Sequence, residues 1–70
     1  MRLSARNQLV GTVRSVKEGV VTAEVVVQLD GGQEIVSVIT LESVRSLAIK
    51  PGSRVTAIIK STEVLLATDS

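Results

Sequence analysis

The sequence has no cysteine, no histidine and no aromatic residue, and only one proline among its 70 residues. Without cysteine there is no thiolate nucleophile and no disulfide, and without histidine there is no imidazole base or zinc-binding nitrogen. Ser-His-Asp triads and zinc sites are therefore excluded. A close pair of carboxylates would be the remaining route to catalysis. The glutamates are scattered along the chain with no evident convergence, so we expect a protein that is not an enzyme.

The lack of aromatic side chains also argues against a nucleic-acid partner. Proteins that bind single strands regardless of sequence stack the bases on aromatic rings, and here the net charge is only +1. The sequence shows no basic segment followed by a long apolar run, which is the pattern of a signal peptide or a membrane span. We therefore expect a cytoplasmic protein with no membrane partner.

What the chain does contain is aliphatic: hydrophobic residues make up 44% of it. Seventy residues form one small domain, and a domain of this size hides only about 60% of the surface that its unfolded chain exposes. Since neither disulfides nor metal sites stabilise it, oligomerisation is the remaining common source of stability. We therefore expect residues 1–70 to form a single domain that assembles with copies of itself.

Period-2 alternation and β-branched runs predict strands, separated by glycine-rich turns such as Asp30-Gly31-Gly32 and Lys50-Pro51-Gly52. After Thr40 the spacing changes to Leu41, Val44 and Leu47, which predicts a short helix with Thr40 as its N-cap. This order predicts an all-β fold, a five-stranded OB-like Greek-key barrel with one short helix between strands 3 and 4. An SH3-like barrel is the main alternative, and the helix argues against it. The expected strands are residues 8–16, 20–29, 33–40, 54–60 and 63–67, the helix is 41–47, and 68–70 is a frayed tail.

Hydroxyl, amide and cationic side chains gather at three element boundaries: at residues 4–7, at Thr40 with Ser43, and at residues 60–62. A tetrahedral dianion accepts hydrogen bonds and donates none, so these donors and cations suit a small oxyanion. Each cluster also has a simpler explanation. Thr40 and Ser43 can cap their own helix, Lys60 can be a solvated strand end, and residues 4–7 can be a loose arm.

Taken in order, the segments Ser4-Ala5-Arg6-Asn7, Val38-Ile39-Thr40 with Ser43, Lys50-Pro51-Gly52 and Ile58-Ile59-Lys60-Ser61-Thr62-Glu63-Val64 resemble the Mop domain of the molbindins. These proteins bind molybdate and tungstate, and the resemblance covers nearly the whole chain. It implies an OB-like domain that assembles as a homohexamer, a trimer of dimers, and that stores or buffers molybdate or tungstate in the cytoplasm. It implies molybdenum bound only as the intact oxyanion, with no metal-ligating residue and no other cofactor.

The resemblance places the oxyanion between subunits. Arg6 and Lys60 would offset its charge, the partner subunit's Ser43 would donate a hydrogen bond, and Asn7 would hold the loop. Thr22 stands where many relatives have asparagine, in a segment that the family links with further sites on threefold axes. The alternatives are an OB-fold nucleic-acid-binding module and a ligand-free structural or regulatory assembly domain. The implied oxyanion-binding residues are Ser4, Ala5, Arg6, Thr40, Ser43, Lys60 and Ser61.

Overall fold

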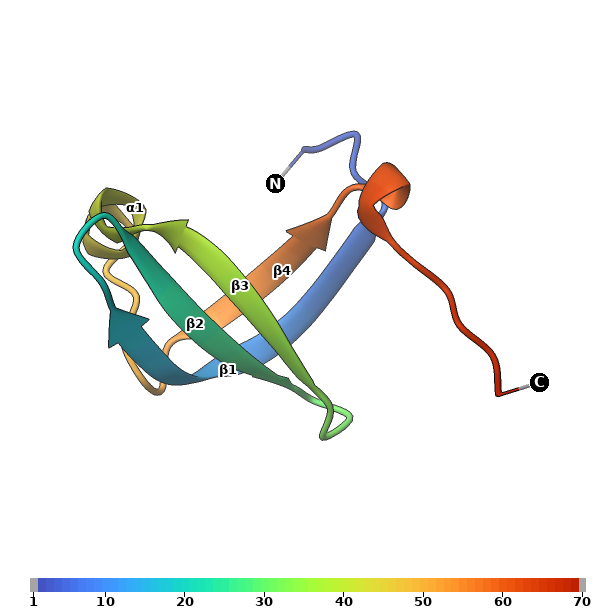
Figure 1. Ribbon diagram of the computed structural model, residues 1–70, viewed down its shortest axis with the longest axis horizontal. Coiled ribbons are helices and arrows are strands. Elements are labelled where there is room, and N and C mark those ends of the chain that lie inside the picture. Colours follow the sequence, from blue (N-terminus) through green and yellow to red (C-terminus); the bar gives the residue numbers. More distant parts are fainter. Residues whose placement is uncertain (1, 70) are drawn as a thin grey trace.

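The computed structural model describes residues 2–69, and its elements follow the predicted order for most of the chain (Figure 1). Ser70, at the end of the tail expected to fray, lies outside the described residues. Among the described residues, no helix is long and apolar enough to span a membrane. The elements are β1 (Asn7–Glu18), β2 (Thr22–Leu29), β3 (Glu34–Thr40), α1 (Leu41–Ser46), β4 (Arg54–Ile59) and the 3-10 helix η1 (Ser61–Glu63).

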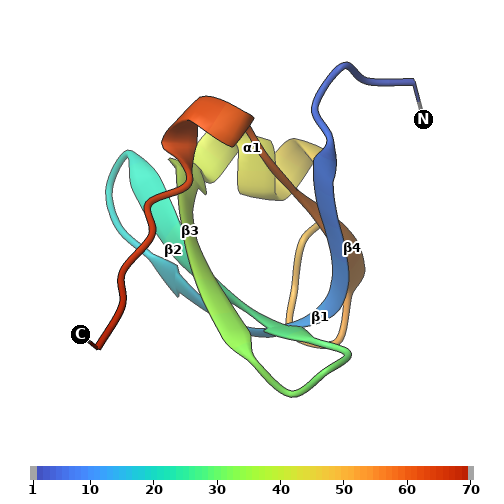
Figure 2. The same cartoon turned by 90° about the vertical axis from the view of Figure 1, so that its right-hand side faces the viewer.

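The four strands form one antiparallel sheet in the order β3-β2-β1-β4. β1 is the longest strand and pairs with β2 along its second half and with β4 along its first half. Two features let it bend between the halves. Arg14 is an extra residue in the register with β2, and a Cβ on Gly11 would lie 2.6 Å from the Gln28 carbonyl oxygen. The bend curls the sheet into the half-barrel of Figure 2.

The core lies on the concave side of this curl and is built from small aliphatic side chains. Val13, Val25 and Val27 are buried on β1 and β2, together with Ala23. Val44 on α1 is buried against them, so the helix covers one end of the half-barrel (Figure 2). Thr40 caps α1 as predicted, and the helix ends at Ser46, one residue before the predicted end. The helix between strands 3 and 4 and the all-β OB-like architecture are thus confirmed.

The predicted fifth strand is wrong for this chain on its own. Glu63 belongs to η1, and residues 64–67 continue beyond it outside any strand. Alternating apolar residues show that a segment can form a strand, but a strand also needs a neighbouring backbone to bond with. The chain turns away from its own sheet after β4 (Figures 1 and 2), so the half-barrel has four strands and stays open between β3 and β4.

The first hairpin also differs from prediction. β1 runs on to Glu18, and β2 starts at Thr22 rather than at Val20. The Gly19 amide donates to the Thr22 carbonyl at 2.8 Å, so Val20 and Val21 form the tip of the turn. Both are exposed in spite of their apolar side chains. Two smaller differences are that β3 begins at Glu34 and that β4 ends before Lys60.

Candidate functional site

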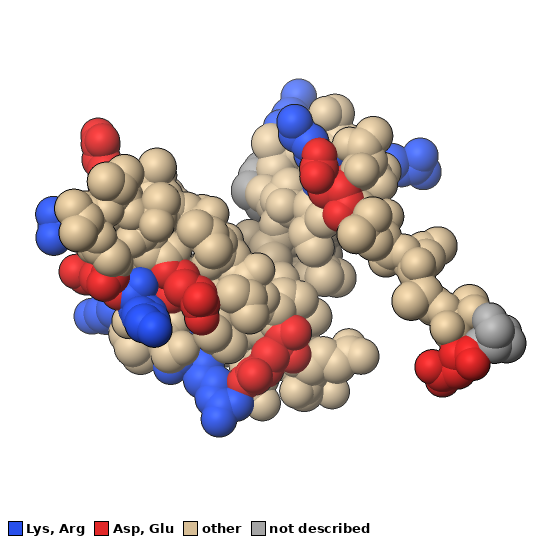
Figure 3. All heavy atoms as spheres, in the orientation of Figure 1, with Lys and Arg blue, Asp and Glu red and all other residues tan. Residues whose placement is uncertain are grey.

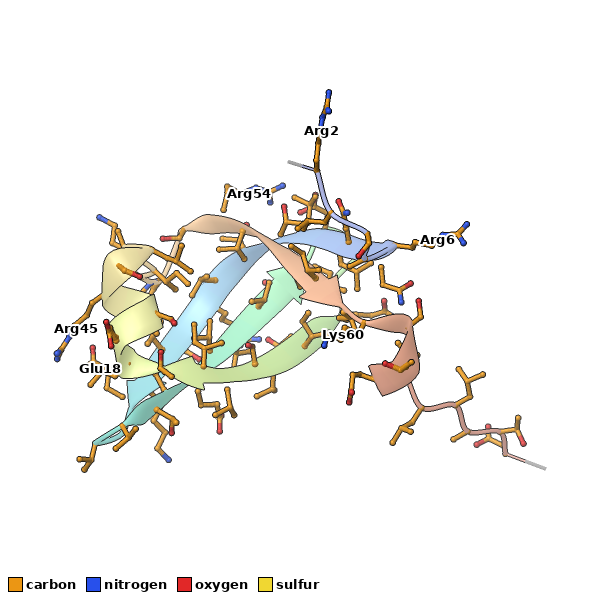
Figure 4. All side chains as sticks on the ribbon, turned by 90° about the horizontal axis from the view of Figure 1, so that it is seen from above. Arg2, Arg6, Glu18, Arg45, Arg54 and Lys60 are labelled. Carbon is orange, nitrogen blue, oxygen red and sulfur yellow. The ribbon has the colours of Figure 1, made fainter. Side chains whose placement is uncertain are left out.

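The opening motif and the late motif meet at one end of the sheet. Asn7, the first residue of β1, pairs with Ile59, the last residue of β4. Because the strands are antiparallel, the residues just before β1 and those just after β4 emerge at this same end. We call this the open end, and it carries Ser4, Ala5, Arg6, Lys60 and Ser61. Figure 4 labels Arg6 and Lys60 there.

Two cations at the open end have no acidic partner. Within residues 2–69, neither Arg6 nor Lys60 lies within ion-pair distance of a carboxylate, although Glu63 follows closely in η1. Both are exposed, and Figure 4 shows Arg6 pointing outward from the start of β1 while Lys60 lies beside the end of β4. Their charge is therefore available to an anion.

Three arginines elsewhere on the molecule have an acidic side chain nearby. Arg14 pairs with Glu34, Arg45 lies 4.0 Å from Glu18, and Arg54 binds Asp30. In Figure 3 basic and acidic side chains accordingly lie next to one another over much of the visible face. Among the described residues Arg2, Lys17 and Lys50 are unpaired as well, so what distinguishes Arg6 and Lys60 is that the pairing of β1 with β4 brings their segments to one end of the sheet.

The Arg54–Asp30 pair is the best formed of these ion pairs. Arg54 donates to both carboxylate oxygens of Asp30, at 2.8 and 3.2 Å, and to the Thr12 hydroxyl at 3.0 Å. The hydrogen bonds from Arg54 lower the pKa of Asp30, and they raise that of Arg54 in turn. This pair ties the β2–β3 hairpin to β4 and lies outside the predicted site.

Hydroxyl donors accompany the two cations. Ser4 and Ser61 are exposed, and neither side chain has a hydrogen-bond partner within the described residues. The loop that carries Ala5 is held by Gln8, whose side-chain amide donates to the Ala5 carbonyl at 3.0 Å. The family resemblance predicts that Asn7 holds this loop. Strand alternation does not predict the bond from Gln8, because it indicates only which face of the strand a side chain lies on.

The remaining predicted residues lie at the other end of the sheet. Thr40 pairs with Thr22, next to the end of β1, and α1 begins directly after it. The Ser43 amide donates to the Thr40 hydroxyl oxygen at 3.0 Å, and that hydroxyl donates to the Ser43 Oγ at 2.7 Å. The capping interpretation of Thr40 is therefore confirmed. One chain does not bring Thr40 and Ser43 to Arg6 and Lys60, because the strand pairing places the first two beside the end of β1 and the last two beside its start.

No three acidic side chains within residues 2–69 lie close enough together to hold a metal ion. The chemistry that the open end offers is hydrogen-bond donation and positive charge, which is the chemistry of anion binding.

The sequence matches the TOBE domain over residues 3–66. The chain belongs to the TOBE domain family. It is 53% identical over 66 residues to molybdenum-pterin-binding protein 1 of Clostridium pasteurianum, an alignment that covers 94% of this chain and 97% of that protein. The resemblance to the Mop domain is thereby confirmed.

Two solved structures of this family share the fold. MopII from Clostridium pasteurianum superposes with a TM-score of 0.91 at 51% identity, covering 96% of this chain and all of that one. ModG, described as a cytoplasmic molybdate-binding protein and solved with molybdate bound, superposes with a TM-score of 0.84 at 51% identity. That match covers 87% of this chain and 43% of ModG. The TOBE chain described here thus has the half-barrel architecture of proteins named for molybdenum and molybdate.

Proposed function

We propose that this protein binds molybdate or tungstate as an intact oxyanion and catalyses no reaction. The observation that carries the proposal is the pair of unpartnered cations, Arg6 and Lys60, at the end of the sheet that also presents Ser4 and Ser61. ModG, which is 51% identical to this chain, has been solved with molybdate bound. Anion binding at the open end accounts both for the two cations without acidic partners and for the similarity to ModG.

The selectivity of such a site follows from its donors. Hydroxyl groups, backbone amides and cations offer hydrogen to every oxygen of a fully ionised dianion. Hydrogen phosphate carries a proton of its own, which only the hydroxyl oxygens among these groups can accept, so a fully ionised dianion uses more of the donors. A pterin is not part of the proposed ligand, because the chain has no aromatic residue on which a ring could stack.

We propose further that the site lies between subunits of a homo-oligomer, a hexamer built as a trimer of dimers. Ser43 and Thr40 lie at the far end of the same chain, so they can reach the anion only from a second copy. The exposed apolar surface supports an assembly, since Val36 and Val38 on β3 and Val10 on β1 all face solvent in the single chain. The full set of proposed anion-binding residues is Ser4, Ala5, Arg6, Lys60 and Ser61 of one subunit with Thr40 and Ser43 of another.

The biological role that fits reversible binding without turnover is storage and buffering of the oxyanion in the cytoplasm. A relative named molybdenum-pterin-binding protein 1 supports the molybdenum binding on which this role depends. A ligand-free assembly domain would keep the fold and the oligomer without binding an anion. A nucleic-acid-binding module would bind single strands in a salt-dependent way instead.

Calorimetric titration of the purified protein with molybdate tests the proposal, with sulfate and phosphate as competing anions. We expect saturable binding that excess sulfate does not abolish. Lys60→Ala should weaken binding at least tenfold, because a hydrogen-bonded charge partner contributes about 1.5–3 kcal/mol.

Lys50→Ala is the matched control, since Lys50 is also an exposed lysine with no ion pair within the described residues and lies in a turn away from the open end. Its affinity should equal that of the unmodified protein. Absence of binding to any oxyanion would contradict the proposal and favour the ligand-free assembly domain. A salt-sensitive mobility shift of labelled single-stranded DNA would favour the nucleic-acid module.

A further inference from the structure

The tip of the β2–β3 hairpin carries the one Asp-Gly bond of the sequence, between Asp30 and Gly31. Both residues are exposed and lie between the end of β2 and the start of β3 (Figure 1). An aspartate that precedes glycine is the one most open to rearrangement, because glycine has no side chain to shield its backbone nitrogen. Asn7 and Asp69 precede glutamine and serine, which do shield it.

The rearrangement needs only these two residues and water. The Gly31 nitrogen attacks Cγ of Asp30 and forms an N–Cγ bond, while the amide proton and a carboxyl hydroxyl leave together as water. Hydrolysis of the resulting succinimide at its α-carbonyl adds a water molecule back. The main chain then runs through Cγ, and the residue is an isoaspartate of unchanged mass. Because the departing oxygen must be protonated, the ionised carboxylate does not react.

The attacking nitrogen is free in this hairpin. The Gly32 amide donates to the Leu29 carbonyl at 2.9 Å, and the Leu29 amide donates to the Gln33 carbonyl at 2.7 Å. Neither backbone hydrogen bond of the turn uses the Gly31 amide. A Cβ placed on Gly31 would meet no atom outside its chain neighbours within 4 Å. The nucleophile of the rearrangement is therefore neither bonded nor shielded.

The carboxylate under attack is held by Arg54 of β4. The guanidinium donates to both carboxylate oxygens of Asp30, at 2.8 and 3.2 Å, and its bond to the Thr12 hydroxyl at 3.0 Å fixes its own position. One of these carboxylate oxygens has to leave as water, so ring closure must break at least one bond from Arg54. The same hydrogen bonds lower the pKa of Asp30, which makes the reactive protonated form rarer.

We propose that the Asp30–Gly31 bond is a site of isoaspartate formation and that Arg54 slows the reaction by holding the Asp30 carboxylate. Arg54 is a positioning residue, since it takes no part in the bonds that form and break. It lies 24 residues away in sequence and reaches Asp30 only in the folded sheet, so the protection is a property of the fold. Neither residue belongs to the proposed anion site, and the inference is independent of molybdate binding.

Ageing of the purified protein at neutral pH tests the proposal. A glutamate-specific protease releases residues 25–34, and electron-transfer fragmentation identifies isoaspartate there by cleaving its additional main-chain carbon–carbon bond. Arg54→Gln should raise the rate of isoaspartate formation about threefold, the scale of an exposed ion pair. Arg14→Gln is the matched control, because Arg14 pairs with Glu34 of the same hairpin and leaves the Asp30 carboxylate untouched. Its rate should equal that of the wild-type protein.

A double variant tests the attacking nitrogen. Gly31 does not adopt a positive φ, so alanine fits there and its methyl group shields the nitrogen. Arg54→Gln with Gly31→Ala should therefore form little or no isoaspartate. As much isoaspartate as in Arg54→Gln alone would contradict the assigned bond.

Salt gives a second measurement that does not depend on the folding of a variant. Sodium chloride at about 1 M screens an exposed ion pair, so it should raise the rate of the wild-type protein and leave that of Arg54→Gln unchanged. Equal rates for wild type and Arg54→Gln would overturn the protective role of Arg54. So would an equal rise in Arg14→Gln, which would assign the effect to loosening of the hairpin, or a wild-type rate that salt does not change.

Discussion

The two ends of this half-barrel differ in how much of their structure the single chain completes. At the α1 end, Val44 is buried, Thr40 caps the helix, and Arg45 lies near Glu18. At the open end, Arg6 and Lys60 have no acidic partner within residues 2–69, and Leu65 and Leu66, which follow η1, are exposed. The difference lies in the helix cap and the ion pair, since Val20, Val21 and Leu47 are exposed at the α1 end as well. The open end is available for an anion and a second copy.

Charge reversal at the open end should have the largest effect on binding and almost none on folding. Lys60→Glu removes an attraction to the dianion and adds a repulsion, so molybdate affinity should fall by at least about a hundredfold. Because Lys60 is exposed and unpaired, the free energy of unfolding at pH 7 should change by less than about 0.5 kcal/mol. Titration calorimetry and urea denaturation measure the two quantities. A large loss of stability with unchanged molybdate affinity would contradict this prediction, because Lys60 would then support the fold and not bind the anion.

Removal of core volume at the α1 end should have the opposite effect, a loss of stability with little change in molybdate affinity. Val44→Ala leaves a cavity beneath the helix and should lower the free energy of unfolding by about 2 kcal/mol. Urea denaturation at several protein concentrations checks this. The loss should appear at every concentration, because Val44 packs against side chains of its own chain. A loss that varies with protein concentration would show that the α1 end depends on a second copy.

The sequence predicts the α1 end better than the open end, and the reason is physical. The change from period 2 to the spacing of Leu41, Val44 and Leu47, preceded by a threonine, depends on interactions within a few residues. The sequence therefore predicts the helix and its N-cap correctly. The pattern of residues 63–67 indicates a strand with equal clarity, but which backbone it pairs with is a property of the assembled surface and not of the segment.

The site residues also differ in how far the sequence predicts their positions. The order of motifs predicts Arg6 and Lys60 together, and the pairing of Asn7 with Ile59 brings their segments to one end. Sequence alone does not show that Thr40 and Ser43 lie at the opposite end, because that depends on how the strands are ordered in the sheet. Gln8 is missed for a related reason, since its bond to the Ala5 carbonyl depends on the shape of the opening loop.

The cap offers a smaller and more local test of the α1 end. Thr40→Ala removes the hydroxyl that accepts from the Ser43 amide and should cost about 1 kcal/mol of stability, which Thr40→Ser should restore. Ser4→Ala, at the open end, is the matched control and should leave the denaturation midpoint unchanged. If Ser4→Ala costs as much as Thr40→Ala, then Ser4 supports the fold and is not free for a ligand.

The smallest effect concerns the Asp30–Arg54 ion pair, which lies away from both ends. The hydrogen bonds from Arg54 lower the pKa of Asp30, so the folded state holds the ionised carboxylate more strongly than the unfolded state does. This stabilisation is present above the ordinary aspartate pKa of about 3.9 and is lost as the pH falls through the lowered folded value. Asp30→Asn should therefore be slightly less stable than the unmodified protein at pH 7. The two denaturation curves should converge in acid, and a gap that widens in acid would contradict the pairing.

The most direct test of the account is the position of molybdenum in crystals grown with molybdate, found by anomalous scattering at the molybdenum absorption edge. The account predicts a peak within hydrogen-bonding reach of Arg6, Lys60 and Ser61 of one copy, with Ser43 supplied by another. A peak remote from Arg6 and Lys60, or one enclosed by a single copy, would contradict it.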